Sequence, residues 1–236
     1  MERITDIWIS LYFTEPILLN VMLVTFIVSI IKRKKIPSFR WLPHYLGFFL
    51  LFFLADYAYT IFLFPANQDR VQRFQREVNF YITLVEMLVF MHFFLAEVRS
   101  IPLKRILRLI RVSAVICFLY VYITTHLDYG FITYRKLNMV YIIQLTALLA
   151  SSGFYFIQLF REAPVSNLKE LPGFWIATGL SFYCLCTLPL TIASSYFFNT
   201  DRETVYINLY SIIYLFYILL FVLIIRSFLC RPLKTM

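Results

Sequence analysis

The sequence predicts an all-α, polytopic membrane protein built as one bundle of seven transmembrane helices. The chain of 236 residues is 61% hydrophobic and only 15% charged. This hydrophobic fraction exceeds what a soluble domain of this size needs for its core. Apolar runs near the ~20 residues that cross ~30 Å of hydrocarbon recur seven times. The alternating pattern of β-strands is absent from the sequence, which disfavours a membrane β-barrel.

The predicted spans follow one another with short connections, so residues 1–236 are expected to form a single membrane domain. We place the spans at residues 15–31, 42–64, 78–96, 109–125, 137–160, 173–197 and 204–225. The first span opens at Pro16, which suits the first turn of a helix. It does not match a cleavable signal peptide, because its basic cluster IKRKK follows the apolar run.

The later spans differ in what interrupts their apolar character. The second carries Asp56 within FFLADYAYTIF, the third carries Glu86, and the fifth carries Gln144. The fourth run lies between a basic stretch and His126, and the sixth contains Pro189. The seventh carries tyrosines at helical spacing, for which packing and interhelical hydrogen bonding are the expected role and a ligand wall the alternative.

The distribution of basic residues predicts the orientation. Fifteen of the 22 Lys and Arg residues fall on one face and seven on the other. The positive-inside rule therefore places the N-terminus outside and the C-terminus in the cytoplasm, as a multi-pass protein of the cell inner membrane. Membrane lipid is the expected partner of the excess positive charge, and nucleic acid is not.

Two carboxyl groups stand out because Lys and Arg, and the other acids, lie in loops or at span ends. Asp56 lies eight residues before Phe64 and Glu86 eight residues after Val78, so both are expected about 12 Å below the outer edge. Ionisable groups inside a membrane are costly and usually face a cavity or a partner. Two acids at one depth would share a proton or bind a cationic or hydrogen-bonding ligand.

Further polar side chains are predicted at similar depth and would complete an outward-facing polar pocket. They are Asn20, Gln144, Thr187, Asn208, Tyr210 and Ser211. In the alternative interpretation the two acids are protonated and only hydrogen-bond neighbouring helices. Pro189, two residues after Thr187, is the candidate hinge, because proline frees a backbone carbonyl and permits a kink. The scattered histidines and cysteines predict neither a metal site nor a cofactor.

Two segments resemble a known family. The run LKELPGFWIATGLSFYCLCTLPL, residues 168–190, is similar to the penultimate span of the seven-transmembrane modules that accompany bacterial sensor histidine kinases. The likeness rests on a short loop with a proline, an aromatic-Trp-Ile start, a glycine and a tyrosine. These residues are Pro172, Phe174, Trp175, Ile176, Gly179 and Tyr183.

Residues 78–107 also resemble the third span of that module, with Glu86 at its acidic position. After Arg226 only ten residues remain, without a phosphoacceptor helix or an ATP-binding domain. The resemblance therefore implies a sensor or accessory module that signals through a partner, such as a histidine kinase or another membrane protein. Oligomerisation stays open.

The sequence thus favours a non-enzymatic membrane sensor that binds a ligand or proton in an outward-facing pocket. A small secondary transporter that uses Asp56 and Glu86 as a proton or cation site is the alternative, with Pro189 marking a broken helix. An intramembrane enzyme is the weakest hypothesis, because only the two acids would qualify as catalytic groups. A rhodopsin is excluded, because the seventh span has no lysine for a retinal Schiff base.

Overall fold

The computed structural model describes residues 2–32, 41–63, 68–162, 168–198 and 203–230. Over these residues the chain is helical without any strand, which confirms the all-α prediction. The elements in chain order are α1 (Glu2–Lys32), α2 (Leu42–Leu63), α3 (Gln68–Glu97), α4 (Ile101–Tyr129), α5 (Tyr134–Glu162), the 3-10 turn η3 (Leu168–Glu170), α6 (Pro172–Phe198) and α7 (Glu203–Leu229).

All the helices except α2 are longer than the apolar runs that predicted them. The largest differences are at two helix starts: α1 begins at Glu2 instead of residue 15, and α3 begins at Gln68 instead of residue 78. Eight of the first ten residues of α3, QDRVQRFQRE, are polar or charged, so hydropathy does not detect this stretch. The start of α4 likewise precedes its predicted span and carries Lys104, Arg105 and Arg108. Hydropathy marks the part of a helix suited to hydrocarbon, whereas the helix itself continues through polar residues of good helical propensity.

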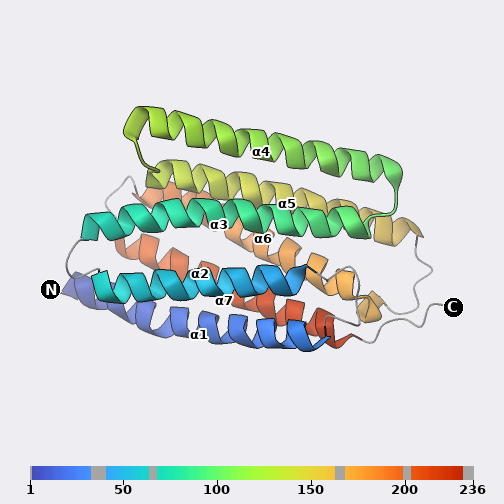
Figure 1. Ribbon diagram of the computed structural model, residues 1–236, viewed down its shortest axis with the longest axis horizontal. Helices are drawn as coiled ribbons and strands as arrows, with labels where there is room; N and C mark the ends of the chain where they lie inside the picture. Colours follow the sequence, from blue (N-terminus) through green and yellow to red (C-terminus); the bar gives the residue numbers. More distant parts are fainter. Residues whose placement is uncertain (1, 33–40, 64–67, 163–167, 199–202, 231–236) are drawn as a thin grey trace.

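Six helices form a closed ring, and α4 lies outside it. Around the ring each helix packs against the next in the order α1, α2, α3, α5, α6, α7 and back to α1. The outer helix α4 packs against α3 and α5 (Figure 1). The start of α1 and the end of α7 lie at opposite ends of the bundle (Figure 1). Side chains that α2, α3, α5, α6 and α7 turn inward therefore meet at the centre of the ring.

Five helical segments are long and apolar enough to cross a membrane. They are Gln72–Glu97, Ile101–Tyr129, Tyr134–Arg161, Pro172–Ser194 and Ile212–Leu229. Shorter apolar stretches lie in the first two helices, at Pro16–Lys32 and Leu42–Asp56. These counts refer to the described part of the chain. The structure thus has the character of a helical membrane protein.

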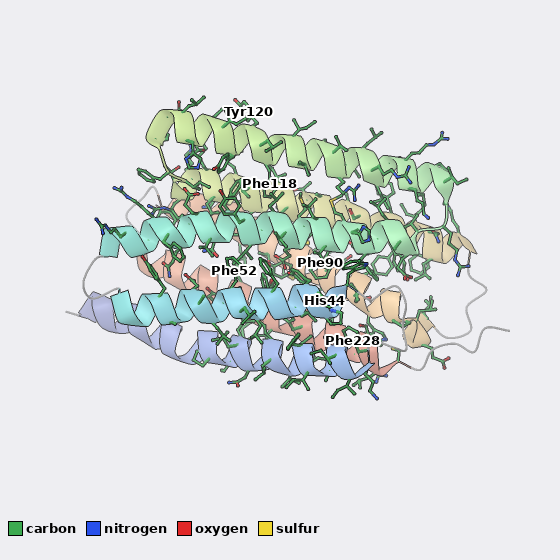
Figure 2. All side chains as sticks on the ribbon, viewed as in Figure 1. His44, Phe52, Phe90, Phe118, Tyr120 and Phe228 are labelled. Carbon is green, nitrogen blue, oxygen red and sulfur yellow. The ribbon has the colours of Figure 1, made fainter. Side chains whose placement is uncertain are left out.

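Apolar side chains, aromatic and aliphatic, fill the interior and also cover much of the outer surface. Phe90 of α3 is 2% exposed and lies among the helices of the ring, whereas Tyr120 on the outer side of α4 is 67% exposed (Figure 2). The outward side of α4 also exposes Leu109, Ile116 and Leu127. A helix in contact with lipid requires an apolar outer face, because lipid chains offer no hydrogen-bond partners to polar groups.

Helix α6 continues as an α-helix through Pro189, so the described backbone does not break there. Proline has no N–H to donate to the carbonyl of Leu185, so this turn lacks one backbone hydrogen bond. In the next turn the Thr191 hydroxyl donates to the Thr187 carbonyl at 2.9 Å, an arrangement that often bends helices. The hinge at Pro189 stays a prediction.

The contact between α6 and α7 depends on a small residue. A Cβ atom at Gly179 would lie 3.1 Å from Leu220 Cδ1 and 3.2 Å from Leu223 Cβ. A Cβ atom at Gly153 of α5 would have no neighbour within 4 Å. Close approach of two membrane helices is favoured by small residues at the contact.

We therefore expect Gly179→Val to destabilise the bundle and Gly153→Val to be tolerated. Overpacking of this kind costs about 1–3 kcal/mol. The measurement is the apparent thermal unfolding midpoint of each purified variant in detergent, with the second variant as the matched control. Equal midpoints for the two variants would contradict the described packing of α6 on α7.

Candidate functional site

The carboxyl group of Glu86 lies at the centre of the ring and is hydrogen-bonded on both oxygens. Glu86 is 6% exposed. The Tyr217 hydroxyl of α7 donates to Oε1 at 2.6 Å, and the Gln144 side-chain amide of α5 donates to Oε2 at 2.7 Å. Hydrogen bonds to an ionised group are about twice as strong as neutral ones. The carboxyl group thereby ties α3 to α5 and α7.

Two more tyrosines complete this site. The Tyr45 hydroxyl of α2 lies close to both Glu86 and Tyr217 but is not aligned for a hydrogen bond with either. The Tyr183 ring of α6 lies 5.1 Å from the Tyr217 ring, measured between centroids. We call Tyr45, Glu86, Gln144, Tyr183 and Tyr217 the Glu86 cluster. Five of the seven helices contribute a residue to it.

Asp56 does not belong to the Glu86 cluster. It is half-buried and hydrogen-bonds with Gln75 of α3. Gln75 lies eleven residues before Glu86, which is roughly 16 Å along the helix at 1.5 Å per residue. Asp56 is likewise eleven residues from Tyr45, the residue of α2 that faces Glu86. The prediction that the two acids share a depth is therefore wrong.

The error has a simple cause. In the antiparallel pair of α2 and α3, opposite residues have numbers that add to 131, as for Asp56 with Gln75 and Tyr45 with Glu86. The prediction counted the depth of Glu86 from residue 78, whereas α3 begins ten residues earlier, at Gln68. Measured from the end of the bundle where α2 ends and α3 begins, Glu86 therefore lies deeper than Asp56 does.

The other predicted pocket residues separate into three groups. Gln144 joins the Glu86 cluster, as described above. Thr187 is 2% exposed, lies one turn beyond Tyr183 on α6, and its hydroxyl oxygen has no hydrogen-bond partner. Asn20 is exposed and donates to the Pro16 carbonyl of its own helix at 2.8 Å. The side chains of Asn208, Tyr210 and Ser211 lie outside the described residues.

Sequence reasoning did not assign Tyr45 or Tyr217 to the carboxyl group. The chain contains 17 tyrosines, so no single one is conspicuous. The spacing of Tyr45, Phe49 and Phe53 does mark one face of α2, along which neighbouring rings lie 5.3 and 4.9 Å apart. That face is continued by Asp56, since eleven residues are three helical turns.

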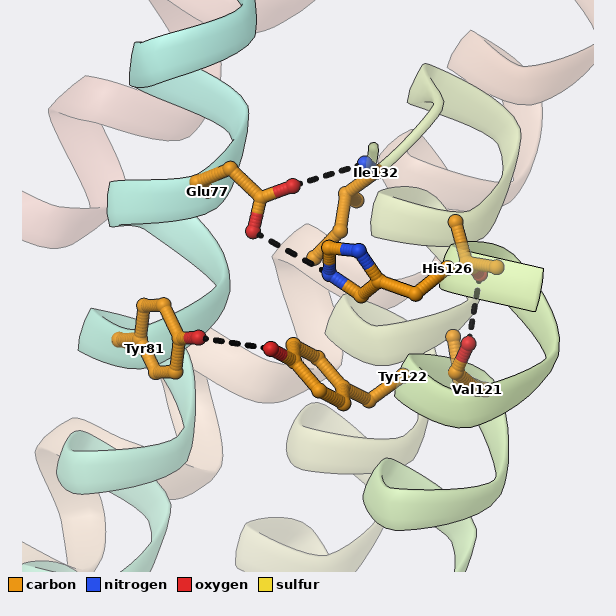
Figure 3. A network of polar contacts seen from close by, with 7 residues as sticks. Glu77, Tyr81, Val121, Tyr122, His126 and Ile132 are labelled. Carbon is orange, nitrogen blue, oxygen red and sulfur yellow. Dashed lines mark hydrogen bonds and ion pairs between the residues drawn. The ribbon is translucent and has the colours of Figure 1, made fainter. Parts of the chain in front are cut away.

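A second polar network lies between α3 and α4. Glu77 Oε1 accepts the backbone N–H of Ile132 at 2.9 Å, and Oε2 lies 3.7 Å from His126 Nε2 (Figure 3). One turn along α3, the hydroxyl groups of Tyr81 and Tyr122 lie 3.3 Å apart (Figure 3). Glu77 thus fastens the turn between α4 and α5 to the first turns of α3.

The chemistry available to the Glu86 cluster is acceptance and release of hydrogen bonds or a proton. Over the described residues no three His, Cys, Asp or Glu side chains are grouped to hold a metal ion. An ionised Glu86 accepts both donors, whereas a protonated Glu86 must itself donate from one oxygen. The protonation state of this carboxyl group is therefore linked to the contacts of α3 with α5 and α7.

We expect Tyr217→Phe to destabilise the bundle, because it leaves Glu86 Oε1 without its aligned donor. An unsatisfied buried polar group costs about 1–3 kcal/mol. For a chain of this length that cost lowers an unfolding midpoint by roughly 2–4 °C per kcal/mol. The matched control is Tyr120→Phe, whose hydroxyl group lies on the exposed side of α4. A Tyr217→Phe midpoint equal to that of the control would mean that this hydrogen bond contributes nothing to stability.

Comparisons with known proteins give no assignment. The chain matches no protein-family model, no curated protein and no solved structure. The geometry of the Glu86 cluster and the chemistry of its residues therefore carry the functional argument.

Proposed function

We propose that this chain is a non-enzymatic membrane sensor or accessory protein in which the Glu86 cluster is the responsive element. One observation carries the proposal: a buried carboxyl group accepts hydrogen bonds from two other helices, at 2.6 and 2.7 Å. A carboxylate inside a bilayer costs ~3 kcal/mol or more unless it is compensated. Its charge and its two donors are therefore closely linked, and a change in either alters the packing of three helices.

The proposal gives the cluster two states. In one, Glu86 is ionised and accepts from Tyr217 and Gln144. In the other, Glu86 is protonated or displaced by a ligand, and one of those bonds is lost or reversed. Tyr45 and Thr187 have buried hydroxyl groups without an aligned partner, so each can take part in a new hydrogen bond. This availability of donors supports a switch over a purely structural contact.

We further propose that all seven helices cross a bacterial inner membrane with the N-terminus outside. The support is the placement of basic residues. The start of α4 carries Lys104, Arg105 and Arg108, and the ends of α5 and α7 carry Arg161 and Arg226. These helix ends lie at the same end of the bundle (Figure 1). The positive-inside rule makes that end cytoplasmic.

The likeness of residues 168–190 and 78–107 to modules of sensor histidine kinases supports a signalling role. Under this proposal the partner is a histidine kinase or another membrane protein. The proposed transfer runs along α6 and α7, which pack closely around Gly179 and carry Tyr183 and Tyr217 of the cluster. The transporter alternative is less well supported, because Asp56 and Glu86 face different partners three turns apart.

The topology is tested with reporter fusions placed after residues 104 and 131. We expect the first site in the cytoplasm and the second outside, because α4 separates them. Reporters on the same side would mean that α4 does not cross the membrane. An exchange of the two sides would reverse the proposed orientation.

The relay is tested with Trp175, which lies at the start of α6 with its ring 5.5 Å from the Arg226 guanidinium carbon. In a variant with Trp8 and Trp41 replaced by Phe, the emission of Trp175 reports on the ends of α6 and α7. We expect Glu86→Gln to change this emission, because the neutral amide cannot keep both hydrogen bonds of the carboxylate. Asp128→Asn, at an exposed acid on α4, is the control.

The outcome separates a relay from a structural contact. A change of emission in Glu86→Gln alone, with the helix content unchanged by circular dichroism, supports transmission from the cluster to the end of the bundle. Emission equal to that of the parent would reduce Glu86 to an interhelical contact.

A further inference from the structure

A second group of interacting residues lies at the end of the bundle where α3 and α5 begin. The guanidinium carbon of Arg73 lies 4.6 Å from the centroid of the Phe131 ring. That of Arg76 lies 5.6 Å from the same ring and 4.6 Å from the Tyr134 ring. Phe131 belongs to the turn between α4 and α5, and Tyr134 is the first residue of α5. We call these four residues the arginine–aromatic cluster.

Arg76 is buried, and no acid among the described residues forms an ion pair with its guanidinium group. Its side chain is 9% exposed, and its Nε atom makes no hydrogen bond. The neighbouring acid, Glu77, directs its two oxygens to the Ile132 N–H and to His126. The pair of Glu77 and His126 is an ion pair when the imidazole is protonated. Among the described residues, the groups that face the positive charge of Arg76 are the rings of Phe131 and Tyr134.

This environment has the features of an anion site. A buried charge without a paired opposite charge is expensive, and stacking on aromatic faces offsets only part of that cost. The first N–H groups of α5 lack acceptors within the helix and add the positive end of its dipole. Arg135 and Lys136 bring two more cations to the first turn of α5. A guanidinium group presents paired N–H donors that match a carboxylate or a phosphate.

We propose that the arginine–aromatic cluster binds a small oxyanion, a carboxylate or phosphate group held by Arg76 and the start of α5. Arg73 is exposed and guides the anion in. Phe131 and Tyr134 hold the two guanidinium groups in position through their rings. The anion comes either from a soluble molecule or from the headgroup of an anionic lipid. The proposal is independent of the role of Glu86.

The test is the apparent unfolding midpoint of the purified full chain in zwitterionic-lipid nanodiscs. Inorganic phosphate and citrate are titrated separately, with sodium chloride adjusted to constant ionic strength. A ligand that binds the folded state alone raises stability by RT ln(1 + [L]/Kd), so we expect a saturable rise of several degrees with at least one anion. We expect Arg76→Gln and Arg73→Gln each to remove the saturable rise.

Arg108→Gln, at the opposite end of the bundle, is the matched control and keeps the rise. If Arg76→Gln does not fold, the exposed Arg73→Gln variant still decides the outcome. Multivalent anions also stabilise proteins without binding, by exclusion from the surface. A rise of equal size in the parent, Arg73→Gln and Arg108→Gln would therefore overturn the proposal.

The source of the anion is distinguished by repeating the titration in nanodiscs that contain phosphatidylglycerol. If the soluble anions still raise the midpoint, the site takes a soluble ligand. If phosphatidylglycerol alone raises the midpoint of the parent and of Arg108→Gln, but not of Arg73→Gln, the site takes a lipid headgroup. The absence of an Arg73-dependent rise in every condition would contradict an anion site.

Discussion

The hydrogen bonds to the Glu86 carboxyl group impose the strongest single constraint on this bundle. Inside hydrocarbon no water replaces a missing partner, so a buried polar group must be satisfied by protein. Gln144 and Tyr217 can reach Glu86 only if α5 and α7 keep one rotation about their axes relative to α3. The Tyr183 ring packs at a tilt against the Tyr217 ring, and Tyr45 lies against the same carboxyl group, so α6 and α2 are oriented by the same contact.

The seven apolar runs, each near the length that crosses a bilayer, predicted the number and type of the α-helices among the described residues. The ends of the helices did not follow from the apolar runs, since eight of the first ten residues of α3 are polar and hydropathy treats this stretch as a loop. Because α3 begins ten residues before its predicted start, the predicted register of α2 against α3 was wrong. A short connection between two antiparallel helices fixes which residues lie opposite, so the pairing of Asp56 with Gln75 follows once the start of α3 is known.

Within the site, the rarity of polar side chains in the apolar spans helped to predict which residues meet, whereas their predicted depth in the membrane did not. Glu86 and Gln144 were predicted because polar side chains are uncommon in these spans, and they meet. Asn20 was predicted for the same reason, yet it bonds to its own helix, because a short amide reaches the carbonyl four residues earlier. Composition cannot distinguish these cases. The tyrosines were too numerous to be singled out, since their partners depend on interhelical distances that no sequence pattern contains.

The Glu86 cluster and the arginine–aromatic cluster both join α3 to α5. Arg76 and Glu86 are ten residues apart on α3, roughly 15 Å along a continuous helix. Arg76 packs on Tyr134 at the start of α5, and Glu86 bonds to Gln144 three turns further along. An anion that draws Arg76 toward α5 acts on the same helix pair whose alignment sets the bond from Gln144 to Glu86. A shift of α3 along α5 therefore changes both sites, which supplies a physical route from the end of the bundle to its centre.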